Sequence, residues 1–144
     1  MQQTFNLERF RAAHRGDGGL TDYATAMQEI KNGHKEGHWM WYIFPQLRGL
    51  GSSQTATYYG IIGKAEAKAY LADKILGSHL REITNNLCQV KGKTAAEIFG
   101  PVDVKKLRSS LTLFYIVSGK EECFRWALAK YFDEKLDPKT LEML

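Results

Sequence analysis

The sequence predicts an all-α fold: a compact single-domain bundle of about seven to eight short helices that takes in residues 1–144. Three observations lead to this prediction. Apolar residues recur three and four positions apart along most of the chain, which is the spacing of one helix face. Scattered glycines mark short turns, whereas strand and hairpin signals are scarce. A length of 144 residues is also typical of one domain.

The N-terminal part of the chain is expected to form two helices. The first is expected to begin at Asn6, whose side chain suits the N-cap position. A glycine-rich loop at residues 16–19 follows. The second helix is expected to begin at Thr21 or Asp22 and to end at Gly33, because glycine is common just after the last turn of a helix.

The most apolar segment, residues 38–46, is expected to lie at the centre of the molecule. It is apolar on all sides, which is typical of a buried segment. Pro45 is expected to end any helix there. The following residues, 47–63, are rich in Gly, Ser and Thr, so we expect a loop with one helical segment around 54–62.

Three further helices are expected in the middle of the chain. Residues 64–72 have high helix propensity. A second helix is expected after Gly77, where apolar residues repeat at helical spacing. Thr94 and Glu97 have the spacing of a capping box, so a short helix is expected to begin there and to end at Gly100.

The C-terminal third is expected to hold the last three helices. Asp103 is expected to cap the first of them, although residues 111–117 are rich in β-branched and aromatic side chains and a strand there is the rival prediction. Residues 121–132 place apolar side chains on one helix face. Asp137 and Pro138 are expected to begin a last short helix, because proline suits the first helical position.

Charge and cysteine content leave several function classes open. The net charge is +4 and the pI is about 9.0, which permits a phosphate-bearing partner without requiring one. The basic residues form no long run, so solvated faces are favoured and a nucleic-acid partner is not expected, although charge alone does not exclude it. Cys88 and Cys123 are expected to be reduced, partly buried thiols.

No membrane partner is expected. The first twenty residues carry several charges and lack the apolar core of a signal peptide. The longest apolar runs, 39–45 and 111–117, are far shorter than the ~20 residues that span a bilayer. We therefore expect a cytoplasmic protein.

Three short motifs fall short of known cofactor and metal signatures. Residues 49–54 lack the third glycine of a dinucleotide-binding loop, and residues 92–94 lack the first glycine of a P-loop. His34 and His38 have a spacing that could bind zinc on a helix, but glycines interrupt the segment and no further ligand completes the set. Neither a cofactor nor a metal is expected.

The aromatic segment is the first candidate for a binding site. Trp39 and Trp41 could stack against a base or a sugar, while His38 and Gln46 at its polar ends could fix the orientation of a ligand. The alternative is that these aromatic side chains simply form the core.

Three blocks of sequence closely resemble the bacterial Domain of Unknown Function 1810 family. The blocks are residues 38–46 with 49–51, residues 66–71 with 76–77 and 80–82, and residues 98–100 with 103, 106–107 and 109–114. The resemblance covers about residues 5–144. It implies a small, mainly α-helical, cytoplasmic bacterial protein with no established activity. Members are sometimes labelled calpastatin, a name that nothing in this chain supports. His14 stands where the family pattern has Gln.

Many members of the family motif are polar, which favours a lined pocket. They are His38, Gln46, Glu66, Arg81, Glu82, Asp103, Lys106, Ser109 and Ser110. A motif that served packing alone would not need them, because each buried polar group costs about 1–3 kcal/mol unless it is hydrogen-bonded. The alternative is a set of helix caps and ion pairs, such as Lys106 or Arg81 with Glu66.

Two functions follow from these alternatives, and the sequence leaves open whether the protein is an enzyme. The first is an aromatic-lined pocket for a nucleotide-like or ADP-ribose-like ligand, with hydrolysis as its candidate reaction. Glu66 or Asp103 would then act as general acid or base, and Lys106 or Arg81 would bind phosphate. Ser109 and Ser110 would line the pocket. The second is a non-catalytic helical module that binds a protein partner or forms a homodimer.

Overall fold

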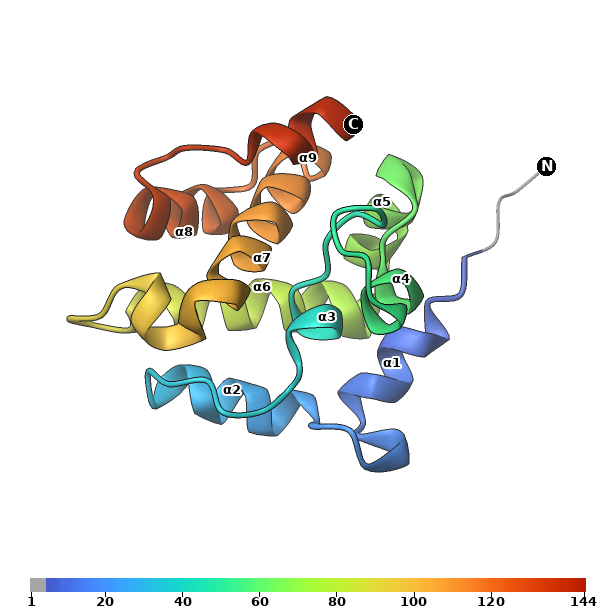
Figure 1. Ribbon diagram of the computed structural model, residues 1–144, viewed down its shortest axis with the longest axis horizontal. Coiled ribbons are helices and arrows are strands. Elements are labelled where there is room, and N and C mark those ends of the chain that lie inside the picture. Colours follow the sequence, from blue (N-terminus) through green and yellow to red (C-terminus); the bar gives the residue numbers. More distant parts are fainter. Residues whose placement is uncertain (1–4) are drawn as a thin grey trace.

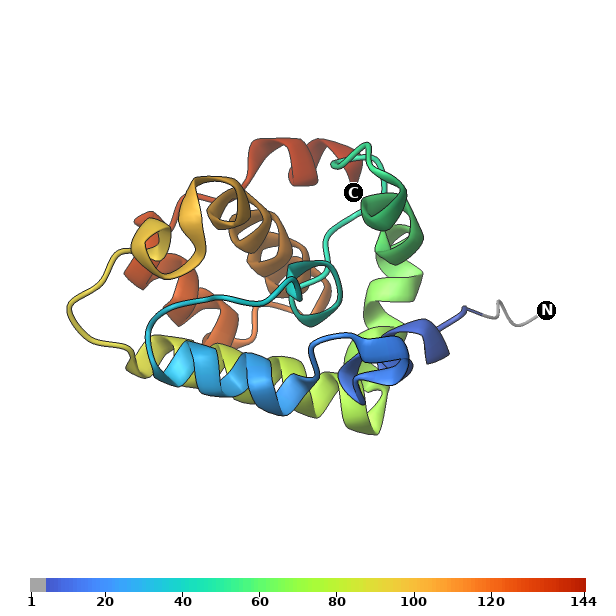
Figure 2. The ribbon, with the colours of Figure 1, turned by 60° about the horizontal axis from the view of Figure 1, so that its bottom comes forward.

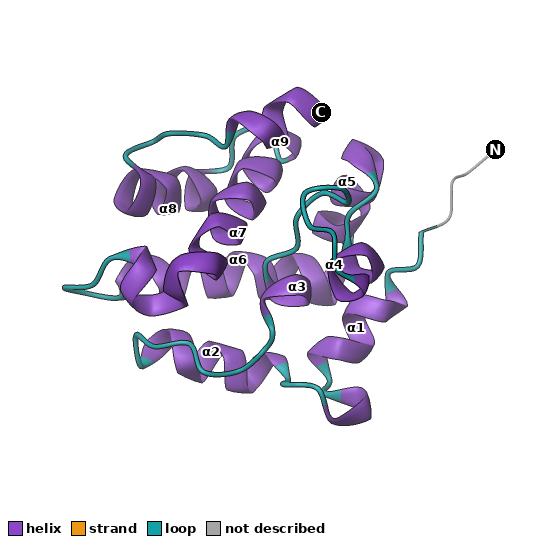
Figure 3. Ribbon diagram, viewed as in Figure 1, coloured by secondary structure: helices purple, strands orange, loops and turns teal. Residues whose placement is uncertain are grey.

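The computed structural model describes residues 5–144, and this part of the chain is all-α (Figure 3). It holds nine α-helices, close to the number predicted. They are α1 (Glu8–His14), α2 (Tyr23–Lys31), α3 (Met40–Ile43), α4 (Gln54–Tyr59), α5 (Gly63–Ala72), α6 (Lys74–Gln89), α7 (Ala95–Val117), α8 (Glu122–Phe132) and α9 (Pro138–Met143), with a short 3-10 helix η1 (Asp17–Gly19) after α1.

Two long helices organise the packing. Helix α6 packs against α2, α5 and α8, while α7 packs against α5, α8 and α9 (Figure 1). Helix α2 lies alongside α6 (Figure 2). The short helix α3 contacts α1, α4 and α7, so the aromatic segment lies among these elements.

The aromatic segment is central, as predicted. Trp39, Tyr42 and Phe44 are each at most 1% exposed, and α3 ends before Pro45. Trp39 also donates its indole N–H to the Glu29 carboxylate at 2.7 Å. This bond satisfies the one polar atom that burial of an indole ring would otherwise leave unpaired.

Local capping chemistry sets several helix starts as the sequence predicts. The Asp22 side chain accepts a hydrogen bond from the Thr25 backbone N–H at the start of α2. Thr94 and Glu97 form the predicted capping box at the start of α7. Asp137 caps α9, with Pro138 in its first turn.

Three boundary predictions are wrong. Leu7, rather than Asn6, is the N-cap of α1. Helix α6 begins at Lys74, so Gly77 lies within its first turn instead of before it. Asp103 lies inside α7 and caps nothing, because a sharp kink at Gly100 (φ 86°, ψ 167°) already breaks the helix and a new helical segment begins directly after it.

The rival strand prediction for residues 111–117 is also wrong, since this stretch continues α7. Within residues 5–144 the β-structure is confined to an isolated parallel bridge between Leu47 and Ile61. Ile61 donates its backbone N–H to the Gln46 carbonyl at 2.9 Å there. The bridge therefore fixes the backbone that carries Gln46.

Candidate functional site

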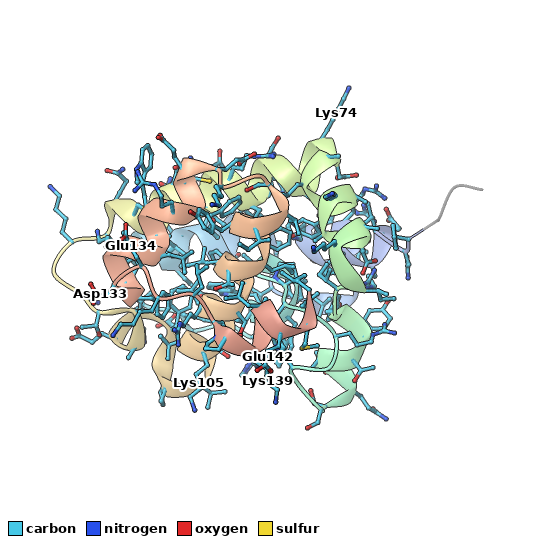
Figure 4. The ribbon with its side chains drawn as sticks, turned by 90° about the horizontal axis from the view of Figure 1, so that it is seen from above. Lys74, Lys105, Asp133, Glu134, Lys139 and Glu142 are labelled. Atoms are coloured by element: carbon cyan, nitrogen blue, oxygen red, sulfur yellow. The ribbon has the colours of Figure 1, made fainter. Side chains whose placement is uncertain are left out.

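A recess of about 330 Å³ lies between the loop after α3, the kinked helix α7 and the start of α9. We call it the Lys106 recess. Its lining residues are Gln46, Leu50, Val102, Lys105, Lys106, Ser109, Asp137 and Lys139. In Figure 4, Lys105 and Lys139 lie at the same side of the molecule although they come from different helices.

The kink in α7 produces one wall of this recess. After Gly100 the chain starts a fresh helical segment, in which Val102, Lys105, Lys106 and Ser109 follow one another at spacings of three, one and three. Residues at these spacings share one face of a helix. The sequence therefore presents two ammonium groups and a hydroxyl to the same hollow.

Positive side chains predominate in the lining of the Lys106 recess. Three lysines line it against one carboxylate, that of Asp137. The Lys106 ammonium lies 4.7 Å from the ring centroid of Trp41 and 3.5 Å from Oδ1 of Asp103. The indole face and the carboxylate together hold this ammonium in place while its side chain stays partly accessible.

Lys35 forms a second ion pair with Asp103. Nζ of Lys35 lies 2.8 Å from Oδ2 of Asp103, and this lysine side chain is only 8% exposed. Lys35 also donates to the Gly37 carbonyl at 2.6 Å and lies 5.1 Å from the ring centroid of Trp39. Asp103 thus links Lys35 to Lys106. The pair with Lys106 has helical spacing, whereas sequence spacing does not indicate the pair with Lys35.

Glu66 lies in a different place, where it forms a buried ion pair with Arg9. The guanidinium approaches the two carboxylate oxygens at 3.0 and 3.2 Å, and the Ile62 backbone N–H donates to Glu66 at 2.8 Å. Arg9 also donates to the carbonyls of Tyr58 and Gly60. The pair therefore ties α1 to the segment between α4 and α5.

Arg81 lies in a third place. It makes two hydrogen bonds of 2.9 Å with the Glu121 carboxylate and a third with the Leu71 carbonyl. The ion pairs suggested by the sequence, Lys106 or Arg81 with Glu66, are therefore not formed. Arg9 and Glu121 are the partners that sequence reasoning missed.

The remaining residues of the predicted site do not all line the Lys106 recess. His38 is exposed, whereas Trp39 is completely buried. Ser110 is completely buried as well, and its hydroxyl has no hydrogen-bond partner within residues 5–144. The structure thus brings Gln46, Lys106 and Ser109 together, with Trp41 and Asp103 beside them.

A pair of imidazoles, buried His14 and half-buried His79, lies outside the predicted site. Nδ1 of His14 and Nδ1 of His79 are 2.9 Å apart, and Nε2 of His14 lies 2.9 Å from the Tyr42 carbonyl. A carbonyl only accepts, so Nε2 of His14 carries the hydrogen, and His79 must donate through Nδ1. Burial lowers the pKa of His14 to about 4 and also lowers the pKa of His79.

The part of the chain that the structure describes lacks the features of a metal site and of a membrane-spanning helix. No group of three or more His, Cys, Asp or Glu side chains in residues 5–144 could hold a metal ion. Cys88 and Cys123 are free and partly buried, as predicted, and burial raises the pKa of Cys123 to about 11. Within the same residues, no helix is long and apolar enough to cross a membrane.

The comparisons with known proteins decide the family. The model of a family described as "Protein of unknown function (DUF1810)" matches residues 4–144. The chain belongs to the DUF1810 family. The crystal structure of the conserved hypothetical protein Rv1873 from Mycobacterium tuberculosis is similar, with 44% sequence identity, a TM-score of 0.91, and coverage of 97% of this chain and 96% of that one. No curated protein matches.

Proposed function

We propose that the Lys106 recess binds a small phosphate-bearing ligand of the nucleotide or ADP-ribose class. The observation that carries this proposal is the convergence of Lys105, Lys106 and Lys139 on one hollow, with a single carboxylate among its lining residues. Lysine ammonium groups are common phosphate ligands, in which role they act as compact point charges.

The groups around Lys106 favour a phosphate as the partner of its ammonium group over a simple surface ion pair. Asp103 holds this ammonium at 3.5 Å, a distance at which a stronger anionic partner can compete. Trp41 offers a flat ring beside the same ammonium, and Gln46 offers both an amide donor and an acceptor. These groups suit a ligand with a charged end and a planar or polar body.

The size of the recess restricts how much of a ligand it encloses. Its volume of about 330 Å³ is near the lower end of the ~300–1,000 Å³ range of small-molecule pockets. A phosphate and the group next to it would fit inside. The rest of a dinucleotide would extend over the surface.

If the ligand is hydrolysed, Asp103 rather than Glu66 would act as the general acid or base. Asp103 contacts Lys106 at the edge of the recess, whereas both oxygens of Glu66 are engaged by Arg9 in another part of the molecule. Binding does not depend on this reaction. Product analysis with ADP-ribose and NAD, for the wild type and for Asp103→Asn, tests it separately.

The binding experiment is calorimetric titration and thermal shift with AMP and ADP-ribose, with adenosine as the ligand that lacks phosphate. We expect binding of the phosphate compounds, and stabilisation of about 2.7 kcal/mol once the ligand reaches a hundred times its Kd. Lys106→Ala should weaken binding about tenfold or more. Lys74→Ala is the matched control, because Lys74 is exposed and lies far from Lys105 and Lys139 (Figure 4).

Equal binding by Lys106→Ala and Lys74→Ala would contradict the proposal. Absence of binding by any phosphate compound would do the same. If light scattering then found a defined dimer or a stable complex, the non-catalytic protein-interaction module would be the better description.

A further inference from the structure

Asp137 is a carboxylate in the wall of a recess whose other charges are positive. Its Oδ2 accepts hydrogen bonds from the Thr140 backbone N–H at 3.0 Å and from the Thr140 hydroxyl at 2.6 Å. The Ser109 hydroxyl, 3.2 Å away, shares its one hydrogen between this oxygen and the Lys105 carbonyl at 3.1 Å. Among residues 5–144, Oδ1 of Asp137 has no hydrogen-bond partner. One oxygen therefore caps α9, and the other is available.

The position of this carboxylate is fixed by its neighbours. The Asp137 backbone N–H donates to the Thr112 hydroxyl at 2.9 Å. Arg108 donates to the carbonyls of Lys135 and Leu136, at 2.8 Å in each case. Side chains of α7 therefore hold the backbone before α9 at three successive residues, so the free oxygen of Asp137 is preorganised.

A carboxylate here is not required by the cap. Asn or Ser caps a helix about as well as Asp does, and a negative charge in the wall opposes phosphate binding. A carboxylate oxygen is instead an acceptor without a hydrogen of its own, and it accepts strongly from hydroxyl groups. This chemistry suits a ligand that carries hydroxyl groups close to its phosphate.

We propose that the ligand of the Lys106 recess is a sugar phosphate, and that Asp137 accepts a hydrogen bond from its sugar hydroxyls. This inference rests on the proposed function, whose nucleotide-like ligands contain a sugar phosphate, and adds the residue that recognises the sugar. The three lysines bind the phosphate, and Asp137 selects for the sugar. The carboxylate weakens the binding of a plain phosphate ester and favours an ester whose hydroxyl groups reach Oδ1.

The test compares ribose 5-phosphate with methyl phosphate, a monoester of similar charge without hydroxyl groups. For the wild type we expect calorimetric titration to give about tenfold tighter binding of ribose 5-phosphate, as for one hydrogen bond to a charged group. In Asp137→Asn the side-chain oxygen still caps α9 and an amide N–H₂ replaces the free oxygen. We expect this variant to lose the preference and to bind methyl phosphate more tightly than the wild type does.

Asp137→Ser is the second variant, because serine also caps and has no second side-chain oxygen in the position of Oδ1. The urea midpoint of each variant verifies that it folds, and Asp133→Asn, which also removes one negative charge but at an exposed position, controls for net charge. The inference is overturned if the wild type binds both esters equally, or if the preference survives both substitutions, and the proposed function then still stands. If neither ester nor any nucleotide binds, both proposals fail.

Discussion

Arg9 and Glu66 place a full positive and a full negative charge in the interior, where they are 7% and 1% exposed. Desolvation of two charges offsets most of the attraction between them, so such a pair contributes little net stability. Each member nevertheless depends on the other. Loss of one leaves an uncompensated buried charge, whose cost is about 3–5 kcal/mol.

Glu66→Ala is therefore expected to lower the free energy of unfolding by about 3–5 kcal/mol, as measured by urea denaturation. The double variant Arg9→Met with Glu66→Leu should recover part of this loss, because it removes both charges and keeps apolar volume but leaves the Tyr58 and Gly60 carbonyls without the Arg9 donor. A Glu66→Ala protein with wild-type stability would contradict a structural role, and would return Glu66 to the set of candidate catalytic residues.

Residue patterns identified the polar side chains but not their partners. Gln46, Lys106 and Ser109 line one recess, and helical spacing alone places the last two on one face. Arg9 lies 57 positions before Glu66, and Glu121 lies 40 after Arg81. Tertiary packing decides which of many charges meet over such separations, so sequence spacing could not predict these pairs.

At the scale of whole elements, the helices that carry local signals were predicted well. Asp22, Thr94 and Asp137 each cap the helix they were expected to begin, because a cap bonds to a backbone N–H within three residues. Gly77 does not mark the helix boundary that the sequence predicts, although glycine usually interrupts helices. In the structure this glycine allows α5 and α6 to approach closely, because a Cβ at Gly77 would lie 2.1 Å from the Leu71 carbonyl oxygen.

Gly77→Ala should therefore cost about 3 kcal/mol or more, since either the backbone of α5 or that of α6 must move. Gly92→Ala is the matched control. Gly92 has a positive φ of 72° but open space around it, so only the backbone cost of about 1 kcal/mol applies there. Similar urea midpoints for the two variants would refute the idea that α5 and α6 approach closely at Gly77.

At the scale of the whole molecule, His14 joins elements from both halves of the sequence. It lies on α1 and contacts the Tyr42 carbonyl in α3 and His79 on α6. A proton added to His14 would enter at Nδ1, where it would face the N–H of His79. Folding therefore keeps this imidazole neutral.

Stability should consequently fall in acid. The pKa of His14 is about 4 in the folded protein against 6.5 ordinarily, so the unfolded chain takes up the proton first as the pH falls. The contribution is fully present above pH 6.5 and is lost between pH 6.5 and 4, which amounts to about 3 kcal/mol.

Urea unfolding between pH 7.5 and 4.5 measures this loss. His14→Gln replaces the imidazole by an amide that does not titrate, and it should flatten the pH dependence. His34→Gln, which changes an exposed histidine, should leave the slope as in the wild type. A His14→Gln protein with an unchanged slope would show that other groups cause the acid sensitivity.

The three tryptophans occupy three different environments. Trp39 is enclosed, Trp126 is 49% exposed, and Trp41 lies between these extremes with a cation beside its ring. The indole emission of Trp41 responds to the electric field of that cation, so any molecule that draws the ammonium away from the ring changes the colour and intensity of the fluorescence. Replacing Trp39 and Trp126 by phenylalanine would leave an optical reporter already built into the wall of the site.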